Sequence, residues 1–286
     1  MNTHPSRIVC LNAETAEILS LLGEGDRIVG LAGSVSALPE SQHRKPRVSI
    51  QSDSCVERIC SLGPDLVLGS GSKHGPVLAS LAQRGIAVHL FNQPSVRGIL
   101  NMIRVVGALV GREQVAAAQA GSLEWRIEGI RARSHEERRP RIYFEEWSEP
   151  SISASGWISE LIEIAGGTNC FPELASRPHQ EERIVHDLDE VLRRDPDIIV
   201  GSGRGKVQLG QIGSREGWAQ MRALIHGEVH EIDAALIQQP GPVALTHGLD
   251  ALHRIVELWR DRTSRMFRTT FLPAVTPVEP VSERVA

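Results

Sequence analysis

The chain has 286 residues, which is enough for one large or two ordinary α/β domains. Its 41% hydrophobic and 23% charged residues are typical of a soluble globular protein. The net charge of −4 gives no electrostatic reason to expect a nucleic acid or an anionic membrane as partner. The four cysteines form no CxxC pair, so scattered buried thiols are favoured over a disulfide or a metal site.

The first third of the chain alternates short apolar runs with helical patterns, as an α/β lobe does. Strands are expected at residues 7–11, 27–31 and 87–91, and helices at 16–22, 56–62 and 77–84. Residues 34–47 are polar and contain proline, which indicates a surface loop. Residues 69–75 are rich in Gly and Ser and follow an apolar run. Ligands of open α/β sheets bind outside the carboxyl ends of the strands, so this loop is predicted on the functional rim.

The middle of the chain is predicted to be helical. Residues 95–110 carry apolar positions at helical spacing, and residues 114–138 are rich in Ala, Glu and Arg. A brief break is expected around Gly111. A helical bridge of this length predicts two lobes that are held stiffly rather than hinged on extended strands.

The last part of the chain reads as a second α/β lobe. Strands are expected at residues 141–144 and 229–232, helices at 157–165, 218–224 and 248–260, and loops at 145–155, 171–186, 201–213 and 235–246. The predicted fold class is therefore α/β, with two Rossmann-like lobes on a helical bridge. The predicted division is an N-terminal lobe at 1–94, a bridge at 95–139, a C-terminal lobe at 140–262 and a flexible tail at 263–286.

A short stretch occurs twice, at residues 57–70 and 189–202, and each copy is led by an acid. Pro64 and Pro196 lie 132 residues apart, and at this offset Pro, Asp, Gly and Ser coincide. Each copy reads as a helix end, a Pro-Asp turn and a buried strand. Two copies at one offset indicate that the lobes repeat each other.

No convincing catalytic set is present. The run GSGRGKV lacks Walker spacing, HGEVH is not HExxH, and no GxSxG occurs. Glu145 and Glu146 could form an acid/base pair, but a solvated loop or contacts to a polar ligand are favoured. We therefore predict neither enzymatic activity nor a metal site.

The segments VERICSLGPDLVLG, VGALVGRE, WISELIEIAGG and LDEVLRRDPDIIV resemble the class III substrate-binding proteins of bacterial ABC importers. These proteins bind vitamin B12, haem or ferric siderophores, and the resemblance runs from about residue 7 to residue 259. FEEWSEP and PGPVALTHGLD point more narrowly to the cobalamin-binding branch. The resemblance implies a monomer that holds a corrinoid as its ligand, without a covalently bound cofactor, and delivers it to an ABC permease.

The resemblance also implies docking residues. In the cobalamin-binding branch one acid on each lobe docks onto arginines of the permease. Glu57 and Asp189 match these positions, and Glu190 is adjacent if the alignment slips by one. The alternative is that these acids are ordinary residues favoured near helix N-termini by the helix dipole.

Ligand contacts are expected from the facing rims of the two lobes. A corrin needs a flat aromatic surface together with hydrogen-bonding groups, and Trp147 is the best stacking candidate. Trp157 and Trp218, at helix starts, are expected to be packed, and Trp125 and Trp259, within helices, to be structural. Polar or edge contacts are expected from Glu145, Glu146, Gln51, Ser70, Lys73, His74, Arg204, Gln239 and Pro240.

The sequence departs from the cobalamin-binding branch in two ways. Gln51 stands where that branch has a stacking Trp, and no signal peptide or lipobox cysteine precedes residue 7. As written, the sequence predicts a cytoplasmic chain, whereas the family resemblance implies the periplasm. A ferric siderophore or haem carrier, and a cytosolic corrinoid-handling factor, therefore stay open as alternatives.

Overall fold

The computed structural model describes residues 4–33, 38–49, 54–71, 74–134, 138–202 and 209–271, and the side chains among them except those of 209 and 266–271. The N-terminal lobe is built on a parallel sheet in the order β2-β1-β3-β4. Ile8 and Val9 of β1 are fully buried, as expected for a parallel strand covered on both faces. The elements of this lobe are β1 (Ile8–Cys10), α1 (Ala13–Leu21), η1 (Gly25–Arg27), β2 (Ile28–Leu31), α2 (Glu40–His43), α3 (Cys55–Ser61), β3 (Leu66–Ser70), α4 (Gly75–Gln83) and β4 (Ala87–Phe91).

The C-terminal lobe contains a five-stranded sheet with the order β6-β5-β8-β9, and β7 pairs with β5 beside β6. Its strands are β5 (Arg141–Ser148), β6 (Ser151–Ser153), β7 (Thr168–Asn169), β8 (Ile198–Gly201) and β9 (Val229–Glu231). Its helices are α7 (Gly156–Ile164), α8 (Pro172–Ala175), η3 (Gln180–Arg183), α9 (Asp189–Arg194), α10 (Leu209–Gly213), η4 (Trp218–Gln220), α11 (Arg222–Ile225), α12 (Ala234–Ile237), η5 (Ala244–Gly248) and α13 (Leu249–Phe271).

The two sheets repeat each other, as the duplicated stretch predicted. The parallel trio β1-β3-β4 of one lobe corresponds to β5-β8-β9 of the other. In each trio the central strand follows a short helix, α3 or α9, and a Pro-Asp turn. The acids that lead the two copies therefore lie in the first turns of corresponding helices.

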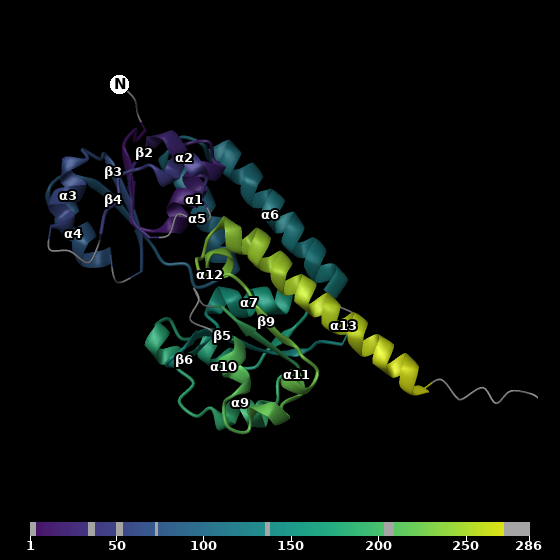
Figure 1. Cartoon of the computed structure of the whole chain (residues 1–286). Helices are drawn as coiled ribbons and strands as arrows, with labels where there is room; N and C mark the ends of the chain where they lie inside the picture. Colours follow the sequence, from purple (N-terminus) through teal and green to yellow (C-terminus); the bar gives the residue numbers. More distant parts are fainter. Residues whose placement is uncertain are drawn as a thin grey trace, which may run out of the picture.

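A helical hairpin joins the lobes and confirms the predicted bridge. Its helices are α5 (Val96–Leu109) and α6 (Glu113–Ser134), and Gly111 turns the chain between them at a φ of +72°. A Cβ on Gly107 would lie 2.2 Å from the Cβ of Ala116, so glycine permits the close approach of the two helices. Figure 1 shows α6 running along both lobes, with α13 beside it.

One hydrophobic core runs through both lobes. Its buried side chains include Ile8 of β1, Ile103 of α5, Ile127 of α6, Ile142 of β5 and Trp259 of α13. Because these residues form one continuous cluster, lobe separation would expose apolar surface. The described part of the chain contains no helix that is both long and apolar enough to span a membrane.

The structure corrects several expected loops. Residues 145–148 continue β5 instead of forming a loop, because β6 pairs with them in an antiparallel hairpin. The expected loops at 34–47, 171–186 and 235–246 contain short helices, and the expected helix at 218–224 is split into η4 and α11. The helix α13 continues to Phe271, past the point where the tail was expected. Trp125, expected to be structural, is 81% exposed, whereas Trp218 is packed as predicted.

Candidate functional site at the lobe junction

The rims of the two lobes meet at close contacts. The Val243 N–H donates to Glu17 Oε2 at 3.3 Å, and the Val96 N–H donates to Glu160 Oε2 at 2.9 Å. A Cβ on Gly156 would lie 2.3 Å from the carbonyl oxygen of Pro94, so only glycine fits there. The carboxyl ends of β1 and β4 therefore face the start of α7 and the segment before η5.

On the N-terminal rim a buried acid organises the predicted ligand contacts. Glu14 is 2% exposed, and its Oε1 accepts hydrogen bonds from Asn12 Nδ2 at 2.8 Å and Ser70 Oγ at 2.9 Å. The backbone N–H of Ser70 donates to His74 Nδ1 at 3.0 Å. Burial raises the pKa of Glu14. The predicted residues Ser70 and His74 thus belong to one network, in which Ser70 is half-buried and His74 is buried.

On the C-terminal rim Glu145 is a buried structural anion. Its side chain is fully buried and binds Arg215 through two contacts of 2.7 and 2.8 Å. The Tyr143 hydroxyl donates a third hydrogen bond at 2.9 Å. The guanidinium of Arg215 also lies 4.5 Å from the ring centroid of Trp218. The two contacts hold the guanidinium of Arg215 in position. Because no atom of Glu145 is exposed, Glu145 itself offers no surface to a ligand.

Glu146 is engaged separately. Its Oε2 lies 2.5 Å from Arg183 Nη1, and Arg183 also donates to the Ser153 carbonyl at 2.6 Å. Gln238 Nε2 donates to the Glu146 carbonyl at 2.8 Å and also to the Ser202 carbonyl. Glu145 and Glu146 each pair with an arginine of their own, which does not favour the acid/base alternative.

Trp147 is an aromatic residue near the end of β5, on this rim. It is half-buried, and its indole N–H donates to the Glu149 carbonyl at 2.9 Å. It lines a pocket of about 360 Å³ together with Pro150, Ile152, Gln180, Glu181 and Ile184. A flat ring at the edge of an open pocket can stack on a ligand, so the geometry is compatible with the predicted role.

The predicted contacts Gln239 and Pro240 lie half-buried in the segment between α12 and η5. The next residue, Gly241, packs against α1: a Cβ there would lie 2.6 Å from Glu17 Oε2 and 3.0 Å from the Cβ of Glu14. This segment therefore reaches the N-terminal rim. The other predicted contacts, Gln51, Lys73 and Arg204, lie outside the described residues.

Sequence reasoning missed five residues of this junction: Glu14, Glu17, Arg183, Arg215 and Gln238. The sequence does contain a pattern that could have indicated Glu14 and Glu17. Glu14 and Glu17 lie three residues apart in a mostly apolar helix that directly follows a buried strand. Such a spacing places both acids on one helix face near the rim.

The predicted docking acids lie on the surface. Glu57 in α3 is exposed, and Arg84 Nη2 lies 2.8 Å from its Oε1, which lowers the pKa of Glu57. Asp189 is exposed at the start of α9 and forms no ion pair within the described parts of the chain. Glu190 is half-buried and pairs with Arg193 at 2.7 Å and Arg194 at 2.8 Å. Asp189 is thus the freer of the two adjacent acids.

All four cysteines are free; Cys10, Cys55 and Cys170 are buried, and Cys60 is half-buried. Among the described side chains, no group of three or more His, Cys, Asp or Glu residues is placed to hold a metal ion.

Comparison with known proteins identifies the family. The family model described as "Periplasmic binding protein" matches residues 8–236, and this range covers both lobes and the bridge. The chain belongs to this family. A cobalamin-binding protein of Halobacterium salinarum is 28% identical over 70% of this chain, and the match spans 54% of the relative's own length. A vitamin B12-binding protein of Vibrio campbellii is 24% identical over 84% of this chain and 85% of the relative.

Solved structures show the same fold. The periplasmic vitamin B12-binding protein of Vibrio cholerae has a TM-score of 0.71 at 22% identity, covering 89% of this chain and 98% of that one. A periplasmic haem-binding protein from Roseiflexus has a TM-score of 0.72 at 24% identity, covering 88% and 99%. The predicted two-lobed fold and the family resemblance are both confirmed.

Proposed function

We propose that this protein binds cobalamin or a related corrinoid between its lobes, as the substrate-binding component of an ABC-type uptake system. The observation that carries the proposal is that cobalamin- and B12-binding relatives match most of the chain at 24–28% identity. In this role the protein works outside the cytoplasmic membrane. A 25% identical relative, an ABC transporter substrate-binding lipoprotein of Bacillus subtilis that covers 87% of this chain, agrees with that location.

The proposed contacts combine one aromatic surface with a polar rim. Trp147 would stack on the corrin, while Ser70, His74, Gln239 and Pro240 would contact its amide arms and edge. Glu145 and Glu146 would act through Arg215 and Arg183, which they hold in place. Gln51, Lys73 and Arg204 remain proposed contacts on sequence grounds alone.

Retention of a coloured ligand tests the proposal. The purified chain is mixed with cyanocobalamin, desalted and read by visible absorbance, in parallel with haemin and a ferric hydroxamate siderophore. We expect cyanocobalamin to be retained at micromolar protein concentration. Retention of haemin or the siderophore alone would assign the site to that ligand and reject the corrinoid.

A matched pair of tryptophan variants tests the stacking residue. Trp147→Ala should weaken retention by about fivefold or more, because stacking on a flat ring contributes about 1–3 kcal/mol. Trp125→Ala removes the same side chain from the outer surface of α6, where Trp125 is 81% exposed, and should retain ligand normally. Equal retention by both variants would remove Trp147 from the site.

We also propose that Glu57 and Asp189 dock the protein onto the permease, one acid from each lobe. Two exposed carboxylates at corresponding lobe positions can fix the orientation of a partner that carries arginines. Reversing both charges, with Glu57→Arg and Asp189→Arg, should abolish stimulation of the importer's ATPase while cyanocobalamin retention stays normal. Full stimulation by the double variant would refute this docking role.

A further inference from the structure

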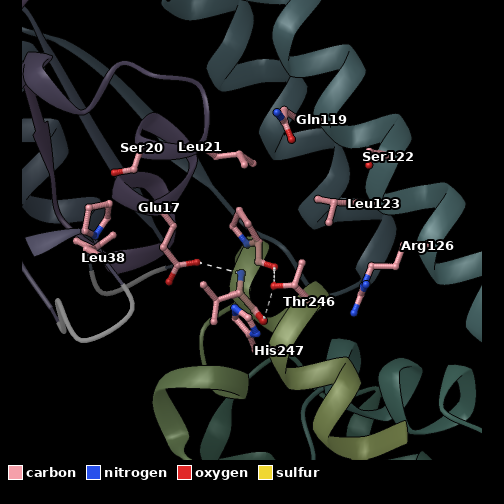
Figure 2. A pocket seen from close by; sticks show the side chains of 13 residues that line it. Glu17, Ser20, Leu21, Leu38, Gln119, Ser122, Leu123, Arg126, Thr246 and His247 are labelled. Carbon is pink, nitrogen blue, oxygen red and sulfur yellow. Dashed lines mark hydrogen bonds between the residues drawn. The ribbon is translucent and has the colours of Figure 1, made fainter.

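A second pocket lies at the lobe junction, between α1, α6 and η5, and has a volume of about 490 Å³. Figure 2 shows Glu17 on one side of it and Arg126 on the other, with Thr246 and His247 at its base. Its volume lies in the range of about 300–1,000 Å³ that is usual for small-molecule sites. The N-terminal lobe, the bridge and the C-terminal lobe all contribute to its lining.

The pocket joins apolar walls to a buried acid. Leu21 of α1 and Leu123 of α6 line it, and Glu17 is 5% exposed. Glu17 Oε2 accepts the hydrogen bond from Val243, whereas its buried Oε1 has no hydrogen-bond partner among the described residues. Burial and the neighbouring Glu14 raise the pKa of Glu17 to about 8. The acid is therefore mostly protonated at neutral pH, and among the described residues its Oε1 has no hydrogen-bond partner, neither a donor nor an acceptor for the carboxyl proton.

The other charged groups around the pocket do not provide Glu17 with a positively charged partner. The guanidinium of Arg126 forms an ion pair with Asp250, which balances its charge, although its buried Nε makes no hydrogen bond within the described part of the chain. His247 is exposed on η5. Glu14 is itself an acid, so it supplies no positive charge to Glu17. A positively charged donor is the partner that would favour the ionised form of Glu17.

We propose that this pocket binds a small organic cation, a primary amine whose ammonium group donates to Glu17 while its apolar body packs against Leu21 and Leu123. The terminal torsion of a Glu side chain is soft, so a modest rotation brings Oε1 to the pocket surface. Once the carboxyl group has ionised, a charge-assisted hydrogen bond from the ammonium satisfies the oxygen that otherwise has no partner among the described residues. The ammonium keeps its own protons, and the carboxyl proton of Glu17 is released to solvent. The site is separate from Trp147, so the inference is independent of the proposed corrinoid function.

Titration calorimetry with phenethylamine tests the proposal, with 2-phenylethanol as the neutral analogue and phenylacetate as the anionic one. We expect phenethylamine to bind about tenfold or more tightly than either analogue. At pH 7 its binding should release close to one proton, measured as a dependence of the enthalpy on the ionisation enthalpy of the buffer. Equal affinity for the amine and the alcohol would overturn the proposal.

Three variants keep the test decisive. Glu17→Gln should abolish proton release and lower the affinity for phenethylamine by about tenfold. Ser122→Trp places a ring over the pocket from an exposed position on α6 and should block binding, whereas Ser122→Ala should leave it intact. If Glu17→Gln fails to fold, the Ser122 pair decides alone. Binding that survives Ser122→Trp lies elsewhere and refutes the site. Cyanocobalamin retention by the same samples reports separately on the corrinoid site.

Discussion

Glu17 of α1 and Val243 of the segment before η5 are hydrogen-bonded across the lobe boundary, with 3.3 Å between Oε2 and the backbone nitrogen. The contact joins a side chain from one lobe to the main chain of the other. Because Glu17 is buried and its pKa is raised to about 8, the protonation state of the lobe junction changes near neutral pH. The junction is therefore a place where pH acts on stability.

The first prediction concerns this pH dependence. Glu17 has a folded pKa of about 8, above the ordinary value of 4.5, so the folded state binds more protons than the unfolded state between these values. The contribution of Glu17 to the free energy of unfolding should fall as pH rises through this window, by a few kcal/mol. Glu17→Gln should remove that fall, and urea unfolding at pH 5 and pH 8.5 measures it.

The raised pKa of Glu14 acts with the same sign, so the difference between the wild type and Glu17→Gln is the informative quantity. Glu57→Gln serves as the control, because Glu57 is exposed and its pKa is lowered by Arg84. It should leave the slope above pH 5 unchanged. A Glu17→Gln protein with the wild-type slope would contradict the assignment.

Much of the fold was predictable because local patterns and long-range packing agree. The run at residues 87–91 is a strand in the sequence pattern and in the structure, and the Pro-Asp turns fix where β3 and β8 begin. The hairpin of β5 and β6 was not predictable, because the polar residues Glu145 and Glu146 look like a loop until their arginines are found. Arg183 and Arg215 lie 37 and 70 residues away in sequence, and no local pattern links them.

The second prediction concerns the close approach of the lobes at Gly241. A Cβ there would lie 2.6 Å from Glu17 Oε2 and 3.0 Å from the Cβ of Glu14. Gly241→Ala should therefore destabilise the protein by about 1–3 kcal/mol, because either the segment or α1 must shift. Gly121→Ala on α6 is the control: no atom of the described residues lies within 4 Å of its Cβ position, and alanine favours a helix by up to about 1 kcal/mol. Thermal unfolding of both variants compares them, and a neutral Gly241→Ala would mean that the lobes meet less closely.

The third prediction concerns the buried pair of Glu145 and Arg215. Arg215→Met leaves the fully buried Glu145 without its bidentate partner and should cost about 3–5 kcal/mol. Adding Glu145→Gln removes the unpaired charge and should recover most of that loss. Urea unfolding of the single and double variants measures the coupling. A cost below about 1 kcal/mol for Arg215→Met would show that solvent reaches the carboxylate.

The fourth prediction follows from the ion pair between Arg84 and Glu57, and it depends on the proposed docking role. A permease arginine must compete with Arg84 for the same carboxylate, whereas Asp189 has no such competitor among the described ion pairs. Arg84→Ala should therefore strengthen docking onto the importer, but by no more than about fivefold, because water screens an exposed ion pair and leaves it weak. Arg104→Ala breaks a comparable exposed pair with Glu124, on the bridge, and should change nothing. Affinity for the detergent-solubilised importer at low salt measures both variants. Weaker docking by Arg84→Ala would indicate that Arg84 itself contacts the partner.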